Sequence, residues 1–98
     1  MKNQLINIGF IEWLNQLEIA PYSVMFWDLP KIVQHAYIQK FLRDKFYTHV
    51  IIERDDDYWI VKTLEFKSGN KYNKICFDFN DYDKAFEYGL KHVASKTH

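Results

Sequence analysis

Histidine and cysteine are the residue types that most often bind zinc, and the sequence contains four histidines and one cysteine. They are His35, His49, His92, His98 and Cys76. A structural zinc site usually takes ligands in pairs that lie about two to five residues apart. The nearest pair, His92 and His98, is six residues apart on the expected C-terminal end. We therefore expect no metal and no cofactor.

Cys76 and His49 suggest a second kind of chemistry, because a thiol nucleophile needs a nearby proton acceptor. The strand pattern described below puts both side chains on one face of a sheet. A free cysteine also packs as a small apolar side chain. We favour packing over catalysis, and we expect the protein not to be an enzyme.

Three consecutive carboxylates, Asp55, Asp56 and Asp57, have the oxygen ligands that a hard cation prefers. A calcium loop alternates its ligands, contains a glycine and ends on a glutamate, and this stretch has none of these features. Aspartate also favours turns, where its charge stays in water. We interpret the run as a solvated turn between two strands.

The elements that must position these residues are three strands and three helices. Apolar and polar residues alternate with a period of two over residues 46–53, 58–67 and 72–79, and this predicts three antiparallel strands. Helical spacing of apolar residues predicts helices over residues 1–19, 30–45 and 81–95. The predicted fold is a single α+β domain over residues 1–98, with the order α-α-β-β-β-α. Residues 30–95 form its α-β-β-β-α core, and residues 1–29 form an N-terminal helix and connector.

Strand register decides which side chains face the core. We assume a two-residue loop at Gly69 and Asn70 and a loop with an odd number of residues at the acidic turn. The most apolar faces of the three strands then lie on the same side of the sheet. The predicted core face then contains Phe46, Val50, Ile52, Ile60, Leu64, Phe66, Ile75, Phe77 and Phe79. Lys62 also falls on this face, and its charge is the one misfit.

The opposite face would contain Tyr47, His49, Ile51, Trp59, Val61, Thr63 and Cys76. This set is too apolar for a sheet surface in water. We therefore expect the first helix, a second copy of the chain or a ligand to cover it. The connector Pro21–Leu29 is also apolar, which is typical either of a loop pinned to the core or of an anchor for a partner.

Composition narrows the class of protein. The aromatic share is 18%, which excludes a disordered chain. Lys plus Arg and Asp plus Glu both number 13, so the formal net charge is zero, and general attraction to nucleic acid is absent. The single cysteine and the lack of an apolar stretch of membrane-spanning length lead us to expect a cytoplasmic protein with no membrane partner.

The core's element order resembles that of the double-stranded-RNA-binding domain. The resemblance covers about residues 30 to 95 and concerns topology alone. It implies phosphate binding by basic residues at the start of the last helix. The stretch Asp81-Tyr82-Asp83-Lys84-Ala85 stands there instead, and its carboxylates repel phosphate.

A second resemblance lies in two motifs, Phe41-Leu42-Arg43-Asp44-Lys45 and the run from Phe79 to Leu90. They are similar to the motifs of small uncharacterised proteins from gut Bacteroidales and their mobile elements. The resemblance covers about half of the chain and implies a helix end, a helix start and a packing glycine. It implies no activity.

We predict a non-enzymatic protein-interaction module that binds through the apolar second face, either to a second copy of the chain in a homo-oligomer, a dimer, or to another protein partner. The predicted interaction residues are Tyr47, His49, Ile51, Trp59, Val61, Trp13 and Trp27. The alternative is a nucleic-acid-associated protein that uses the sheet face or the cluster Lys40, Arg43 and Lys45.

Overall fold

The computed structural model describes residues 1–17 and 25–96. Its elements, in chain order, are α1 (Lys2–Asn7), α2 (Phe10–Gln16), the 3-10 helix η1 (Phe26–Asp28), α4 (Lys31–Phe46), β1 (Thr48–Asp55), β2 (Tyr58–Glu65), β3 (Lys71–Phe79) and α5 (Tyr82–Lys96). The three strands form one antiparallel sheet in the order β1-β2-β3. The predicted α+β class with a β-meander is confirmed.

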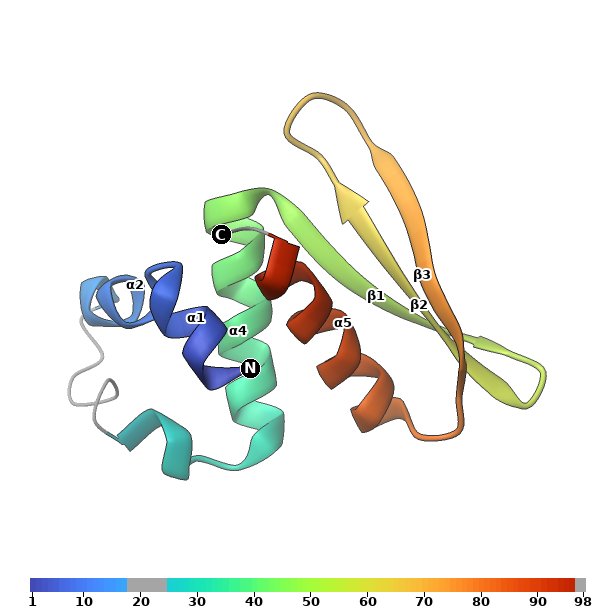
Figure 1. Cartoon of the computed structure of the whole chain (residues 1–98), viewed down its shortest axis with the longest axis horizontal. Coiled ribbons are helices and arrows are strands. Elements are labelled where there is room, and N and C mark those ends of the chain that lie inside the picture. The colour runs from blue at the N-terminus through green and yellow to red at the C-terminus, as the bar shows by residue number, and fades with distance from the viewer. Residues whose placement is uncertain (18–24, 97–98) are drawn as a thin grey trace.

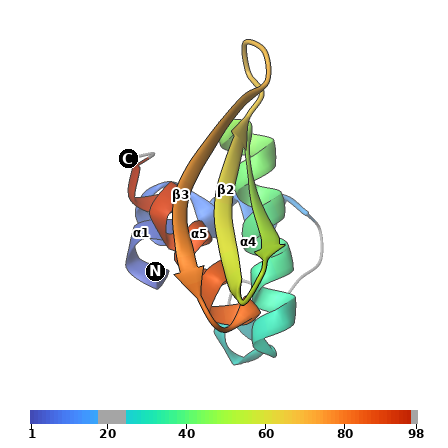
Figure 2. The same cartoon turned by 90° about the vertical axis from the view of Figure 1, so that its right-hand side faces the viewer.

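The described helices all lie on one side of the sheet (Figures 1 and 2). Helices α4 and α5 pack on the sheet, while α1 packs on α5 and α2 packs on α4. The layers are therefore the sheet, then α4 and α5, then α1 and α2. Of the three covers considered for the second face of the sheet, the described N-terminal helices are not the one used, because they dock on α4 and α5.

The N-terminal segment forms two short helices instead of one helix over residues 1–19. Gly9 lies between them with a φ of 95°, a left-handed conformation that glycine adopts without steric cost. The bend turns Leu5 and Phe10 into the core, where both are fully buried. The predicted helix stop at Ala20 and Pro21 lies outside the described residues.

The described part of the connector is held in the core. Phe26 is fully buried, and its ring centroid lies 5.0 Å from that of Phe10 and 4.8 Å from that of Trp27. Gln34 of α4 fastens this segment by donating hydrogen bonds from Nε2 to the carbonyl oxygens of Trp27 and Leu29, at 3.1 and 2.8 Å. This arrangement fits the interpretation of a pinned loop; residues 21–24 of the connector lie outside the described residues.

The strand register differs from the predicted one. Asp55 pairs with Tyr58, so the acidic turn is a two-residue loop, and Asp56 adopts a φ of 50° that aspartate tolerates better than most residues. At the other hairpin Glu65 pairs with Lys71, and a longer loop separates them. Strand β3 also contains irregularities opposite Trp59, Val61 and Lys62.

This register corrects the predicted core face. Val50 and Ile52 do face the helices, but on β2 it is Trp59, Val61 and Thr63 that share their side. Ile60, Leu64 and Phe77, which were expected in the core, point away from the helices. The cause is the even loop length at the acidic turn, since a shift of one residue moves every side chain to the other face.

Helix α5 begins and packs as its sequence predicts. The carboxylate of Asp81 accepts hydrogen bonds from the backbone N–H groups of Asp83 and Lys84, at 2.8 and 3.3 Å, and so caps the helix. Ala85, Gly89, Leu90 and Val93 are buried against the sheet and α4.

Candidate functional site

The sheet face that points away from α4 and α5 is called the outer face. It is formed by His49, Ile51 and Glu53 of β1, by Tyr58, Ile60, Lys62 and Leu64 of β2, and by Tyr72, Lys74 and Phe77 of β3. Figure 2 shows the sheet from this side, with the helices behind it. No helix in the described part of the chain covers the outer face.

The outer face is apolar along its centre and along one edge. Ile60 is only 7% exposed although no helix among the described residues covers it. Tyr72 and Phe77 on β3 are 63% and 61% exposed. Large apolar side chains that share one uncovered surface mark an interaction site more often than scattered ones do.

The charged groups of the outer face are few and partly neutralised. Lys62 Nζ lies 2.8 Å from Glu53 Oε2, which pairs two neighbouring strands. Lys74 Nζ lies 5.0 Å from the centre of the Phe77 ring and makes a cation–π contact. The face therefore combines an apolar surface with one cation that has no carboxylate partner among the described residues.

His49 lies on the outer face near the C-terminal end of α4. Burial lowers the pKa of His49 below its usual value of 6.5, and the nearby charge of Arg43 lowers it further. Its Nδ1 is buried and has no hydrogen-bond partner among the described residues. The ring is therefore mainly uncharged at neutral pH and adds no charge to the outer face.

Both edges of the sheet are protected against pairing with another strand. At the β1 edge, the side-chain amide of Gln39 donates a hydrogen bond to the carbonyl oxygen of Val50 (2.7 Å) and accepts one from its N–H (3.0 Å). At the β3 edge, the register irregularities and the exposed Lys71 and Lys74 interrupt the regular row of donors and acceptors. Each edge therefore has a feature that hinders the addition of another strand.

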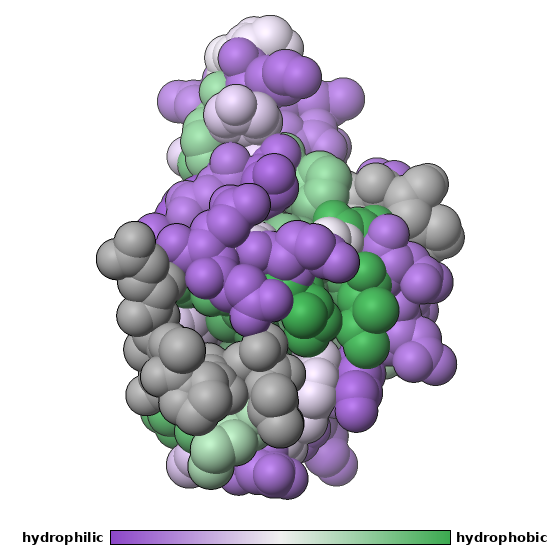
Figure 3. Space-filling model, turned by 90° about the vertical axis from the view of Figure 1, so that its left-hand side faces the viewer, coloured by the Kyte–Doolittle hydropathy of each residue, from purple (hydrophilic) through white to green (hydrophobic). Residues whose placement is uncertain are grey.

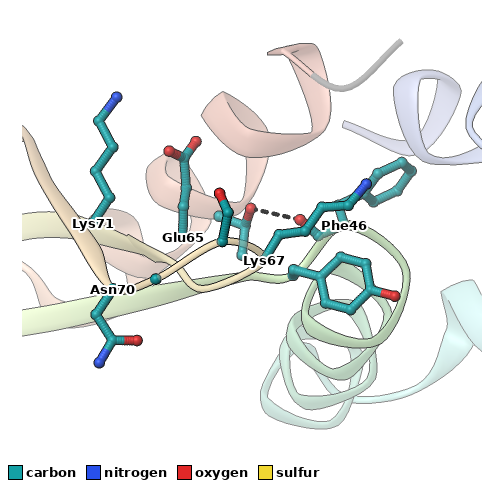
Figure 4. A pocket seen from close by; sticks show the side chains of 9 residues that line it. Phe46, Glu65, Lys67, Asn70 and Lys71 are labelled. Carbon is teal, nitrogen blue, oxygen red and sulfur yellow. Dashed lines mark hydrogen bonds between the residues drawn. The ribbon is translucent and has the colours of Figure 1, made fainter.

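A second surface feature lies where α4, α5 and the β2–β3 hairpin end. Two hollows of about 380 and 110 Å³ meet at Thr48 and Glu65, which line both. Lys67 and Lys71 line the larger hollow and Lys96 lines the smaller. Figure 4 shows Lys67 and Lys71 extending to opposite sides of Glu65. We call this feature the basic hollow.

The structure divides the predicted sheet-face residues between two environments. Tyr47 is exposed beside the outer face, where its ring contacts Phe66, and His49 and Ile51 lie on that face. Trp59 and Val61 instead point toward the helices: Trp59 contacts Tyr82 of α5, and Val61 is fully buried. The sequence places both on the second face of the sheet with His49 and Ile51, and the register described above moves them to the helix-facing side.

The other two predicted tryptophans belong to the helical side of the molecule. Trp13 is buried, with its ring centroid 5.4 Å from that of Phe41. Trp27 is half-buried against Phe10, and Lys2 lies over its ring. Trp13 is 6% exposed and thus offers a partner very little surface. Figure 3 shows the helical side, where hydrophilic residues cover most of the coloured surface and hydrophobic residues gather in a smaller area.

The groups considered for catalysis and metal binding are separated in space. Cys76 pairs with Val61 on the helix-facing side of the sheet, whereas His49 is on the outer face, so the two cannot act as nucleophile and base. No group of three or more potential metal ligands occurs among residues 1–17 and 25–96. His98 lies outside the described residues.

The basic residues considered for nucleic acid lie near the end of α4. Asp44 contacts two of them: its carboxylate is 3.0 Å from Lys40 Nζ and 3.9 Å from Arg43 Nε. Lys45 is exposed in the last turn of the helix, where a cation suits the helix dipole. Asp44 thus reduces the positive potential of this cluster.

Sequence reasoning missed more than half of the outer face. It assigns Ile60, Lys62, Leu64 and Phe77 to the core face, and Tyr58 and Tyr72 to neither face. The signal that could have found them was Lys62. Placing its charge in water, together with that of Lys74, puts the even-numbered residues of β2 on the outer face.

No protein-family model, curated protein or solved structure matches the chain. None of the helices in the described part of the chain is both long and apolar enough to cross a membrane.

Proposed function

We propose that the protein is a non-enzymatic interaction module that binds a second copy of itself through the outer face. The observation that carries the proposal is the exposure of Tyr72 and Phe77 on a sheet face that no described helix covers. An antiparallel sheet with one solvated face normally presents polar side chains to water. Covering these rings would remove apolar surface from water at a gain of about 25 cal/mol per Å².

A second copy suits this face for electrostatic and geometric reasons. The net charge of the chain is zero, so two copies do not repel each other strongly. Two sheets stack face to face at about 10 Å, and each sheet here already has helices on its other side. Stacking through the outer face would give a dimer with both sheets inside and the helices of each copy outside.

The outer face is small for a protein–protein interface. Strand β2 is eight residues long, which corresponds to about 26 Å, and three strands span about 14 Å. The flat footprint is therefore about 370 Å², less than the area of about 800 Å² that each partner buries in a standard interface. We expect a reversible dimer with a dissociation constant in the micromolar range or weaker.

The test is the solution mass, measured by light scattering over a concentration series from about 1 μM to about 1 mM. Wild type should change from monomer to dimer, and Phe77→Glu should remain a monomer with unchanged circular dichroism. Ile32→Glu is the matched control, because Ile32 is 78% exposed on α4, away from the outer face. The proposal would be refuted if wild type stays monomeric at every concentration. It would also be refuted if both variants dimerise as strongly as wild type does.

One observation favours a second candidate function, the binding of single-stranded nucleic acid to the same face. Lys62 and Lys74 lie beside Tyr72 and Phe77, and bases stack on aromatic rings next to cations in many single-strand binders. Retention of a labelled oligonucleotide should then fall steeply with salt. Retention that is absent at about 50 mM salt would exclude this candidate and leave the dimer.

A further inference from the structure

We propose that the basic hollow of one copy binds the acidic β1–β2 turn of another copy, Asp55–Asp57, in a head-to-tail contact. This contact is separate from the outer face and does not depend on it. Like any contact between two different surfaces of one chain, it leaves a free hollow and a free turn at the two ends. Association can therefore continue into an open chain or close into a ring.

The turn offers three carboxylates with no ion-pair partner in the described part of the chain. Asp55, Asp56 and Asp57 are all exposed at the tip of the hairpin, which projects beyond α5 in Figure 1. Asp55 pairs with Tyr58 and the turn contains only two residues, so the carboxylates are held close together. The neighbouring Arg54 does not neutralise them fully, because its guanidinium lies over the Trp59 ring at 5.0 Å.

The basic hollow offers the opposite charge. Lys67, Lys71 and Lys96 form no ion pair with any described carboxylate, and Glu65 is the single acidic residue in the lining. Lys67 is held over the ring of Tyr47, 5.7 Å from its centre, which fixes one cation at the rim. A volume of about 380 Å³ is within the range of hollows that hold small ligands, about 300–1,000 Å³.

The two features lie at opposite ends of strand β2, so they cannot neutralise each other within one chain. The eight residues of β2 separate them by about 26 Å, and charges in about 0.15 M salt are screened beyond about 8 Å. A net charge of zero thus conceals two oppositely charged ends. Two copies placed end to end bring the charges together, whereas a single copy does not.

The test compares two variants in a Phe77→Glu background, which removes the outer-face contact and so separates this proposal from the dimer. The turn variant carries Asp55→Asn, Asp56→Asn and Asp57→Asn, which keep a residue type that turns accept. The hollow variant carries Lys67→Gln, Lys71→Gln and Lys96→Gln. Sedimentation velocity at about 20 mM salt measures the association.

The background chain should associate at about 20 mM salt, and its association should weaken at least tenfold at about 0.5 M salt. Each variant alone should be a monomer, because each lacks one side of the contact. A mixture of the two should form one-to-one pairs and nothing larger, since only one intact turn and one intact hollow can meet. The proposal would be overturned if either variant by itself associates as strongly as the background chain. It would also be overturned if the mixture of the two variants stays monomeric.

Glu65→Gln gives a test in the opposite direction, which an unfolded variant cannot imitate. Removing this carboxylate takes away the one repulsion that the incoming aspartates meet in the hollow. We expect association at low salt to tighten about threefold or more. Unchanged or weaker association of a folded Glu65→Gln chain would contradict the proposed binding of the acidic turn in the basic hollow.

Discussion

The side-chain amide of Gln39 pairs with the backbone of Val50 through two hydrogen bonds, of 2.7 and 3.0 Å, in the way that a neighbouring strand would. Helix α4 thereby closes the β1 edge of the sheet where Val50 would otherwise present a free donor and acceptor. The contact also fixes the helix along that edge. One glutamine thus serves both the packing of α4 and the protection of the sheet.

Replacing Gln39 by leucine should destabilise the fold. The change leaves the N–H and carbonyl of Val50 without partners in a partly buried position, at a cost of about 1–3 kcal/mol in the free energy of unfolding. Urea unfolding measures this loss, and Gln16→Leu on the exposed side of α2 is the control. Equal stabilities of the two variants would show that the edge contact contributes nothing.

Gly89→Ala should also destabilise the fold, although alanine is the better helix former. A Cβ at this position would lie 2.5 Å from Cγ1 of Val50 and 2.9 Å from Cγ1 of Val61. Overpacking costs about 1–3 kcal/mol, which outweighs the gain of about 1 kcal/mol in helix propensity. Adding Val50→Ala makes room for the new methyl group.

The double variant therefore provides the control for Gly89→Ala. In urea unfolding, Val50→Ala should cost less in the Gly89→Ala background than in wild type. A Gly89→Ala chain that is more stable than wild type would mean that α5 does not approach the sheet as closely as described.

The stability of the protein should fall as the pH is lowered. His35 is buried between α4 and α5, with Nε2 3.8 Å from Glu87 Oε2. Burial lowers the pKa of His35, an effect that Glu87 and Asp83 partly oppose and Lys31 reinforces. The unfolded chain therefore binds a proton more readily, so stability is lost as the pH falls from about 6.5 through the lower pKa of the folded state.

His49 and His92 also have lowered pKa values, so a variant must isolate the contribution of His35. The free energy of unfolding, measured with urea at about pH 7.5 and at about pH 5.5, should fall less between these two pH values in His35→Leu than in wild type. His92→Gln, which changes a less buried ring, should remain closer to wild type. Identical pH dependence in His35→Leu and wild type would exclude a role for His35.

Much of the fold was accessible from the sequence, because strand alternation and helix stripes are strong local signals. The meander and the last helix, predicted over residues 81–95 and observed over Tyr82–Lys96, followed from residue type and spacing. The break at Gly9 and the docking of α1 and α2 on the other helices did not, because those depend on contacts between elements far apart in the sequence.

The predicted strand register was wrong, and the register decides which residues form the outer face. An odd loop at the acidic turn would have brought Ile52 opposite Ile60, whereas the two-residue loop places Ile52 opposite Val61. The sequence alone did not distinguish the two loop lengths, since aspartate suits both. The charge of Lys62 was local evidence for the other register, because burying an unpaired ammonium group is costly, whereas Ile60 stays only 7% exposed on the outer face.

The most direct test of the proposed dimer detects contacts between copies at the outer face itself. Isotope-filtered NMR spectra of a mixture of labelled and unlabelled chains, at about 1 mM, record magnetisation transfer only between different copies. We predict intermolecular signals that join Phe77 and Tyr72 of one copy to Ile60 and Leu64 of the other. A dimer whose intermolecular signals come only from the helices, or a chain that gives none, would contradict the account.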